Sequence, residues 1–104
     1  MADKFDELIH APTRLSIVSL LAATEWVEFK VIRDSVGLSD SALSKQLTTL
    51  EEAGYVDVSK GFVGKRPRTT VRLSAAGREA FRGHVAALQA IVARAGATVL
   101  SPNE

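Results

Sequence analysis

Hydrophobic residues recur along the first third of the chain at the spacing of α-helices. Residues 4–10 form a short apolar turn, residues 12–23 carry a broad apolar face, and residues 29–36 place apolar side chains at i, i+3 and i+7. The apolar positions are Phe5, Leu8, Ile9, Leu15, Ile17, Val18, Leu20, Leu21, Phe29, Ile32 and Val36. Pro12 suits the first position of a helix, where its missing N–H costs little. The pattern predicts a short helical turn and two helices, with at most a very short strand at residues 26–28.

A third helix is predicted between Ser39 and Gly54. Ser39 is a favourable N-cap, because its hydroxyl can accept a hydrogen bond from a free backbone N–H of the first turn. Three leucines share one face of this helix: Leu43, Leu47 and Leu50. The opposite face carries short polar side chains and one lysine: Ser41, Ser44, Lys45, Thr48 and, at its edge, Thr49.

Two short runs with strand-forming residues come next. Residues 55–58 and 70–73 are rich in valine and other strand-forming residues, which predicts two antiparallel strands. Gly61, Gly64 and Pro67 mark the connection between them as a loop. We expect Pro67 to stiffen the loop tip, because its ring fixes the backbone and removes one donor.

A long last helix is predicted from Ser74 to about residue 95. Its apolar residues alternate at spacings of four and three, which is typical of a coiled-coil seam. They are Phe81, Val85, Leu88, Val92 and Ala95. A small core cannot fully cover this stripe, so we expect the first four of these residues to form a homodimer interface. The alternative is that the stripe packs on the first helix of its own chain. Residues 96–104 are expected to be a flexible tail.

These elements predict one mainly α domain with a small β-hairpin. The arrangement is that of a winged helix-turn-helix: residues 1–73 form its core, and residues 74–95 add a long C-terminal helix for dimerisation. In this fold the third helix can enter the DNA major groove, while the hairpin reaches along the phosphates. A length of 104 residues, with 46% hydrophobic and 24% charged residues, is ordinary for one globular domain.

The absence of cysteine and of long apolar segments restricts the function further. Without cysteine the chain has no disulfides, thiolate metal sites or cysteine nucleophiles. No segment resembles a signal peptide or is apolar enough to span a bilayer. We therefore expect a soluble, cytoplasmic protein that does not bind membranes.

The charge is unevenly distributed, although the net charge is only +1. Residues 1–57 hold five basic side chains against ten acidic ones, whereas residues 60–72 hold five basic residues and no acidic one. The five are Lys60, Lys65, Arg66, Arg68 and Arg72. A local positive patch on an acidic body can bind a polyanion such as double-stranded DNA.

Two sets of residues are the candidate DNA contacts. Hydroxyls and lysine can bind base edges, which makes the polar face of the third helix a candidate recognition surface: Ser41, Ser44, Lys45, Thr48 and Thr49. Arginine suits bidentate phosphate contacts or a narrow minor groove, which makes the hairpin a candidate wing: Lys65, Arg66 and Arg68. Alone, the polar face of the helix is better explained as a solvated surface, and the alternative for the hairpin is a solubilising loop tip, which its five basic residues without an acid disfavour. Their succession in one short segment favours DNA binding.

Three segments together resemble a known family: PTRLSIVSLL, LSDSALSKQLTTLEEAGYV and GKRPRTTVRLSAAGREAF. The chain resembles, over about residues 5–95, the small stand-alone winged-helix transcriptional regulators of bacteria related to the MarR and ArsR groups. The resemblance implies a homodimer that binds a promoter palindrome and represses transcription. By position, the serines, threonines and lysine named above match the recognition helix, and Lys65, Arg66 and Arg68 match the wing.

The sequence gives little support to other functions. It has no nucleophile elbow, phosphate-binding loop or zinc-protease motif, so we expect no enzyme and no cofactor. His10 and His84 are far apart in sequence and on different helices, so we interpret them as packing or surface residues and expect no metal site. An effector, if one binds, would have to sit in the dimer interface. The alternative to a DNA-binding regulator is a winged helix that serves as a protein-interaction module.

Overall fold

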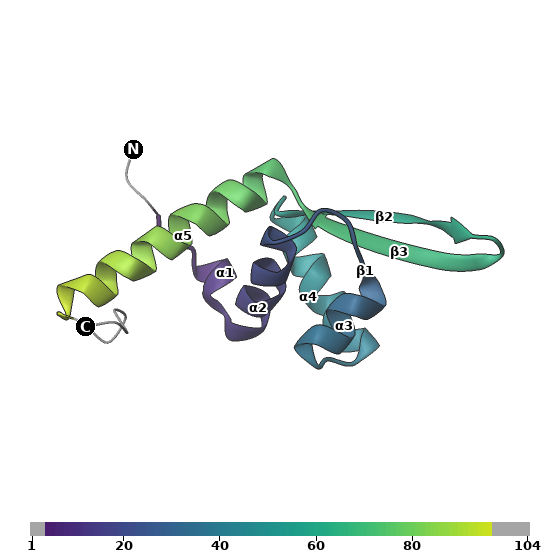
Figure 1. The fold of residues 1–104 in the computed structure, drawn as a ribbon, viewed down its shortest axis with the longest axis horizontal. Helices are drawn as coiled ribbons and strands as arrows, with labels where there is room; N and C mark the ends of the chain where they lie inside the picture. The colour runs from purple at the N-terminus through teal and green to yellow at the C-terminus, as the bar shows by residue number, and fades with distance from the viewer. Residues whose placement is uncertain (1–3, 97–104) are drawn as a thin grey trace.

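The computed structural model describes residues 4–96, which form five helices and a three-stranded antiparallel sheet (Figure 1). The order is α1 (Glu7–His10), α2 (Pro12–Ala22), β1 (Val27–Glu28), α3 (Phe29–Val36), α4 (Asp40–Glu52), β2 (Val56–Val63), β3 (Arg66–Leu73) and α5 (Ala75–Arg94). This order confirms the predicted mainly helical winged-helix fold, with α5 as its longest helix. The expected tail lies outside the described residues, apart from Gly96.

The helices α4 and α5 begin where the sequence supplies a capping serine. Ser39 Oγ accepts a hydrogen bond from the Ala42 backbone N–H at 3.1 Å, and Ser74 Oγ accepts one from Gly77 N–H at 3.0 Å. Both serines are the N-caps that start α4 and α5. Pro12 is the first residue of α2, as predicted. Such caps satisfy donors that have no partner within the helix, which fixes the starting point of each helix.

The hydrophobic core lies where α2, α3, α4 and the inner ends of the strands meet. Its buried side chains are Ile17, Val18, Leu21, Val27, Ile32, Leu43, Leu47, Leu50, Val56, Val71 and Leu73. Each large apolar side chain stabilises the fold by about 1.5–3 kcal/mol when it is fully buried. The three leucines of α4 therefore fix the rotation of this helix, and its opposite face is turned toward solvent.

Polar contacts join α4 to the two helices before it. Arg33 on α3 forms an ion pair with Asp40, the first residue of α4, at 2.9 Å. Arg14 on α2 donates to Gln46 Oε1 on α4 at 2.9 Å, and also to the Leu8 carbonyl. The helix α4 is thus held relative to the rest of the domain by the core and by side-chain contacts.

The hairpin differs from its prediction in length. Residues 61–69 were expected to form a loop, but β2 and β3 are paired from Val56–Leu73 out to Val63–Arg66, and only two residues form the turn. Gly64 has φ +62° at the first position of this turn, where a two-residue hairpin favours glycine. The sheet order is β1-β3-β2, so β3 is the central strand near the core.

Pro67 consequently lies within β3, opposite Phe62, and not at the tip of a loop. Hydrogen-bonded and non-hydrogen-bonded pairs alternate along an antiparallel ladder. The Val63–Arg66 pair next to the two-residue turn is a hydrogen-bonded one, so the following pair, Phe62–Pro67, is non-hydrogen-bonded. An N–H at position 67 would therefore point away from β2. The pairing of β3 with β1 involves only Val71 and Thr70, so that edge is open at Pro67. A proline fits such an open edge without loss of a ladder hydrogen bond.

The start of α5 packs closely against the start of the hairpin. Ser74 N–H donates to the Tyr55 carbonyl at 3.0 Å, and a Cβ at Gly77 would lie 2.1 Å from the same oxygen. Only glycine leaves room for this approach. The N-terminal segment joins this contact through Asp6, whose carboxylate accepts a hydrogen bond from the Tyr55 hydroxyl at 2.5 Å. This hydrogen bond raises the pKa of Tyr55 to about 12, because the phenol loses a strong acceptor when it ionises.

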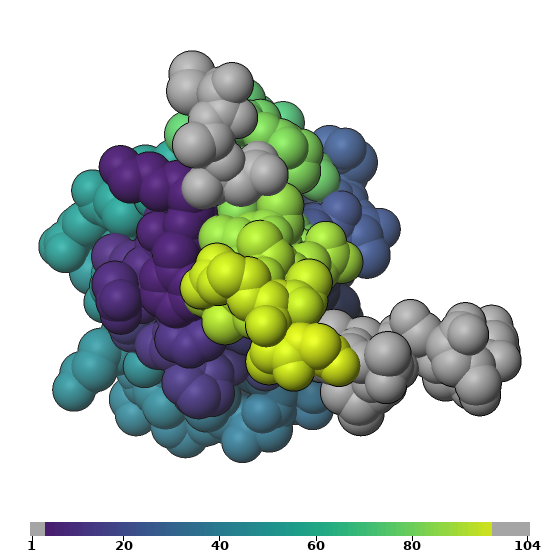
Figure 2. All heavy atoms as spheres, turned by 90° about the vertical axis from the view of Figure 1, so that its left-hand side faces the viewer, coloured from purple at the N-terminus to yellow at the C-terminus, as the bar shows by residue number. Residues whose placement is uncertain are grey.

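The wing and the C-terminal half of α5 extend from the core in opposite directions (Figure 1). Figure 2, seen from the α5 side, shows this helix in front of the core and beside the N-terminal residues. Among residues 4–96, none of the helices combines the length and the apolar composition that a membrane span requires.

Candidate nucleic-acid interface

The polar face of α4 has the exposure that recognition of another molecule requires. Ser41, Ser44, Lys45 and Thr48 are exposed, while the three leucines on the other side are buried. Thr49 is half-buried, and its hydroxyl donates to the Lys45 carbonyl at 3.2 Å. Thr49 is therefore already engaged with its own helix, and the other four residues of this set are the more accessible ones.

A groove of about 400 Å³ separates this face of α4 from the wing. Hydroxyls and an ammonium group line it from both sides: Ser44 and Thr48 from α4, and Lys60 and Thr69 from the two strands. Asp40 and Glu51 also line it, both on α4. The groove therefore places part of the polar face of α4 opposite the wing, and its positive charge, Lys60, comes from the wing side. The candidate wing residues Lys65, Arg66 and Arg68 are not among its lining residues.

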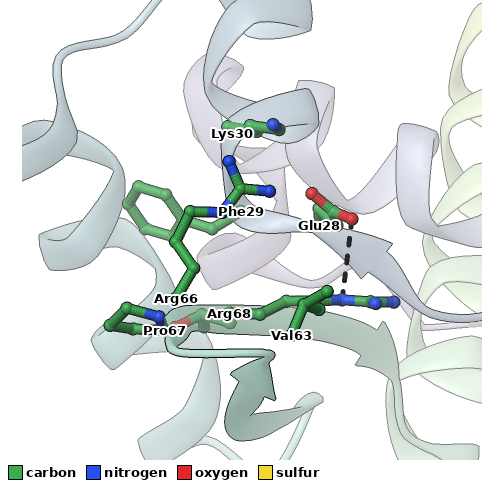
Figure 3. A pocket seen from close by; sticks show the side chains of 8 residues that line it. Glu28, Phe29, Lys30, Val63, Arg66, Pro67 and Arg68 are labelled. Atoms are coloured by element: carbon green, nitrogen blue, oxygen red, sulfur yellow. Dashed lines mark ion pairs between the residues drawn. The ribbon is translucent and has the colours of Figure 1, made fainter.

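A second cleft of about 400 Å³ lies between the wing and the start of α3. Figure 3 shows Arg66 extending from β3 toward Lys30, and Phe29 lines the same cleft. Neither Arg66 nor Lys30 has an ion-pair partner in the part of the chain that the structure describes. Two cations without an acidic partner at one cleft are suited to an anion such as a phosphate.

Lys30 is a candidate contact that sequence reasoning missed. It lies on α3, 36 residues before Arg66, and its charge is not part of a basic run. Only the pairing of β1 with β3 places the start of α3 beside the wing. The sequence offered one weak signal, a single lysine in the first turn of a predicted helix.

The basic residues of the wing differ in whether they already form an ion pair within the described part of the chain. Lys60, Lys65 and Arg66 are exposed and without an ion-pair partner among residues 4–96. Arg68 forms an ion pair with Glu28 at 3.5 Å (Figure 3). Arg72 pairs with Asp57 at 3.1 Å and lies over the Trp26 ring at 4.5 Å. The positive patch that the sequence predicted therefore consists mainly of the first three residues, and Arg72 belongs to the base of the wing.

The structure brings the two histidines together, which their separation in sequence did not suggest. His10 Nδ1 lies 3.3 Å from His84 Nε2, and the Asp6 backbone N–H donates to His84 Nδ1 at 2.9 Å. Because Nδ1 accepts this hydrogen bond, neutral His84 carries its proton on Nε2, which is then a donor toward His10 and not a metal ligand. Among residues 4–96 no three potential ligands come together. The interpretation of His84 as a packing residue agrees with its complete burial.

The apolar stripe of α5 is only partly covered by its own chain. The four residues predicted for the dimer interface, Phe81, Val85, Leu88 and Val92, are all half-buried. Phe81 packs against the hydrophobic core. Ile91, which the heptad pattern did not include, is 43% exposed. The stripe thus contacts its own domain at Phe81, and apolar surface near Ile91 stays accessible.

Comparison with known proteins agrees with this fold. Residues 13–92 match the winged helix DNA-binding domain family. An uncharacterised protein of Methanocaldococcus jannaschii is 29% identical over 79 residues, which cover 76% of this chain and 86% of that protein. The structure of a transcriptional regulator homologue from Pyrococcus horikoshii is 26% identical with a TM-score of 0.78, and the match covers 84% of this chain and 86% of that one.

A more distant structure shares the fold alone. The PcaV transcriptional regulator from Streptomyces coelicolor, solved with its natural ligand, has a TM-score of 0.69 at 21% identity, and the match covers 94% of this chain and 65% of PcaV. The family match and the Pyrococcus horikoshii structure confirm the resemblance to winged-helix transcriptional regulators that the sequence indicated. The family match spans most of the chain and includes α4, the wing and most of α5. The chain therefore belongs to the winged helix DNA-binding domain family, which is non-enzymatic.

Proposed function

We propose that this protein is a sequence-specific regulator of transcription that binds double-stranded DNA as a homodimer, and that it acts as a repressor on a palindromic operator in the cytoplasm. One observation carries the proposal: the exposed polar face of α4 and Lys60 of the wing, which has no ion-pair partner among residues 4–96, border the same groove. A DNA strand that passes between a helix in the major groove and the wing would meet hydroxyls and positive charge there.

In this proposal α4 reads the bases. Ser44, Lys45 and Thr48 are exposed on the helix, and their short or flexible side chains let the helix lie deep in the major groove. Threonine and serine hydroxyls donate to or accept from base edges, and lysine donates to guanine acceptors. Specificity would come from these contacts, because phosphate contacts position a protein without reading sequence.

The wing and the start of α3 supply the contacts to phosphates. Within the described part of the chain, Lys60, Lys65 and Arg66 form no ion pair that DNA binding would have to break, and Lys30 joins Arg66 at its cleft. Arg68 must first leave Glu28, but this pair is half-exposed, and such pairs contribute about 0–1 kcal/mol. The exchange of Glu28 for a phosphate is therefore energetically accessible.

A homodimer through α5 would place two copies of α4 on one face of the DNA. Two-fold related recognition helices bind half-sites about 34–36 Å apart, which accounts for a palindromic operator. A dimer bound across a promoter would exclude the transcription machinery, which is the basis of repression. The half-buried stripe of α5 supports this assembly, because dimerisation would cover it.

The test is selection of duplexes from a random-sequence library by the purified protein, followed by sequencing. We expect enrichment of an inverted repeat, bound by two chains per duplex, and an affinity that falls with salt. Recovery of no enriched sequence, together with equal weak binding to all duplexes, would contradict sequence-specific regulation. That outcome would favour the alternative of a winged helix that binds a protein partner.

A further inference from the structure

The tip of the wing carries an exposed apolar pair that burial in the core does not explain. Phe62 is 73% exposed, more than any other large hydrophobic side chain in residues 4–96. Its partner across the ladder is Pro67, and directly opposed residues share one face of a hairpin. A side chain that stays in water contributes little to stability through burial. The ring is therefore available to another molecule.

The apolar pair lies on the face of the wing that is turned toward α4. Alternate residues of a strand share a face, so Phe62 lies on the same side as Lys60, and Pro67 on the same side as Thr69. Lys60 and Thr69 line the groove between α4 and the wing. The pair thus continues this groove outward to the wing tip, on the side where the proposed DNA lies.

The wing is long enough to reach the next groove of a duplex. Its pairing with β1 ends at Glu28–Thr70, and beyond this pair the ribbon has only two strands. From Ser59, opposite Thr70, to Gly64 at the turn, the free ribbon extends about 17 Å at the rise of an antiparallel strand. Neighbouring major and minor grooves are separated by about half a helical turn, which is also about 17 Å.

The positive charge around the wing tip favours DNA over a second copy of this chain as the molecule that Phe62 contacts. The sequence has no acidic residue between Asp57 and Glu79, and three cations near the tip lack an ion-pair partner among the described residues: Lys60, Lys65 and Arg66. A second copy of this tip would bring like charges together. The minor groove has phosphates on both edges, and its walls of deoxyribose and base edges accept an apolar ring.

On the basis of the proposed function, we propose that Phe62 is an apolar wedge that enters the minor groove and bends the DNA. A phenylalanine inserted at a base step partly unstacks it and kinks the duplex toward the major groove. Such a kink is easiest at flexible pyrimidine–purine steps, namely TA and CA/TG. Phe62 would therefore select a deformable step beside the sequence that α4 reads, without a hydrogen bond to any base.

The competing role of Phe62 is structural. An isolated two-stranded ribbon is marginally stable, and an aromatic cross-strand pair stabilises it. A test must therefore separate the ring from its contribution to the strand. Threonine keeps a high preference for strands but has no wedge, whereas leucine keeps an apolar wedge. Val63 offers a matched control for the bend, because it is 47% exposed at the same tip but on the other face, where it lines the cleft beside α3.

The experiment uses the full chain and the duplex enriched by the wild type, labelled with a dye pair at its two ends. Energy transfer reports the bend, and anisotropy reports the affinity, for the wild type and for F62A, F62T, F62L and V63A. We expect the wild type and F62L to bring the duplex ends together. F62A and F62T should leave the duplex straight and bind about tenfold more weakly, the size of effect expected for an interface anchor. V63A should bend the duplex as the wild type does.

The possible results separate the wedge from the proposed function. If F62A and F62T bind and bend the enriched duplex as the wild type does, the wedge is refuted and the DNA-binding function stands. If F62A fails but F62T bends the DNA, the role of Phe62 is to stabilise the ribbon, which also refutes the wedge. If the wild type enriches no duplex, both the proposed function and the wedge are refuted.

Discussion

Single side chains divide into those that would read bases and those that would hold phosphates. Lys45 and Thr48 project from α4, while Lys65 and Arg66 project from the wing. We expect K45A/T48A to cost roughly 1–3 kcal/mol on the enriched duplex and much less on random DNA. K65A/R66A should weaken binding to all sequences and lower the slope of log affinity against log salt by about 0.9 for each phosphate that the variant no longer neutralises. Titrations on both duplexes at several salt concentrations test this division, and a reversed pattern would show that the two elements have the opposite roles.

At the same scale, His84 makes stability depend on pH. Burial lowers its pKa, and His10 lowers it further, against the weaker opposite effects of Asp6 and Glu7. Neutral His84 is also the form that accepts from the Asp6 N–H. The unfolded chain, with an ordinary histidine pKa near 6.5, therefore binds a proton before the folded one does. The contribution of neutral His84 to the free energy of unfolding should be complete above about pH 6.5 and should be lost as the pH falls below this value.

Urea unfolding at about pH 7.5 and about pH 5.5, on either side of the ordinary histidine pKa, measures this loss. The loss should be smaller in H84Q. An equal decrease in H84Q would exclude His84 as its source.

At the scale of elements, the close contact of α5 with the chain at Tyr55 depends on one glycine. A Cβ at Gly77 would meet the Tyr55 carbonyl oxygen at 2.1 Å, and that oxygen already accepts from Ser74 N–H. Because the obstacle is backbone, the helix must shift, and we expect G77A to destabilise the fold by about 1–3 kcal/mol. Gly83 on the same helix is the control, since its Cβ would lie 3.4 Å from the nearest atom. G83A should be neutral or stabilise by up to about 1 kcal/mol. Thermal unfolding compares the two, and equal effects would contradict the contact at Tyr55.

The elements also show what a single sequence can predict. Helix positions followed from periodicity and caps, because both are local: the leucines of α4 are buried and Ser39 and Ser74 are the N-caps. The predicted length of the wing was wrong, because glycine and proline were interpreted as loop signals. A ladder can continue through Pro67 when the missing N–H faces an open edge, and this depends on the register with β2. Lys30 and the His10–His84 contact depend on how distant segments pack, which local patterns do not contain.

At the scale of the whole molecule, the two extensions of the core would have separate tasks. The wing and α4 lie on one side, and α5 extends to the other (Figure 1). A mutation on α5 should therefore change assembly without changing the surface that would bind DNA. This separation makes the homodimer testable independently of base recognition.

The last prediction concerns L88D. Leu88 is half-buried in the apolar stripe of α5, and a carboxylate there would have to lose its water at a dimer interface without a partner. We expect L88D to sediment as a monomer at micromolar concentration, where the wild type is a dimer. In a dimer, binding of one subunit to its half-site holds the other subunit at a high local concentration near the second half-site. A monomer loses this advantage, so affinity for the inverted repeat should fall by on the order of 10²-fold. Affinity for a single half-site should stay unchanged.

Gln89, the next residue, is the control. It is exposed, so Q89D adds the same charge beside the stripe and should remain dimeric. A wild type that is itself monomeric would show that the stripe serves only its own chain.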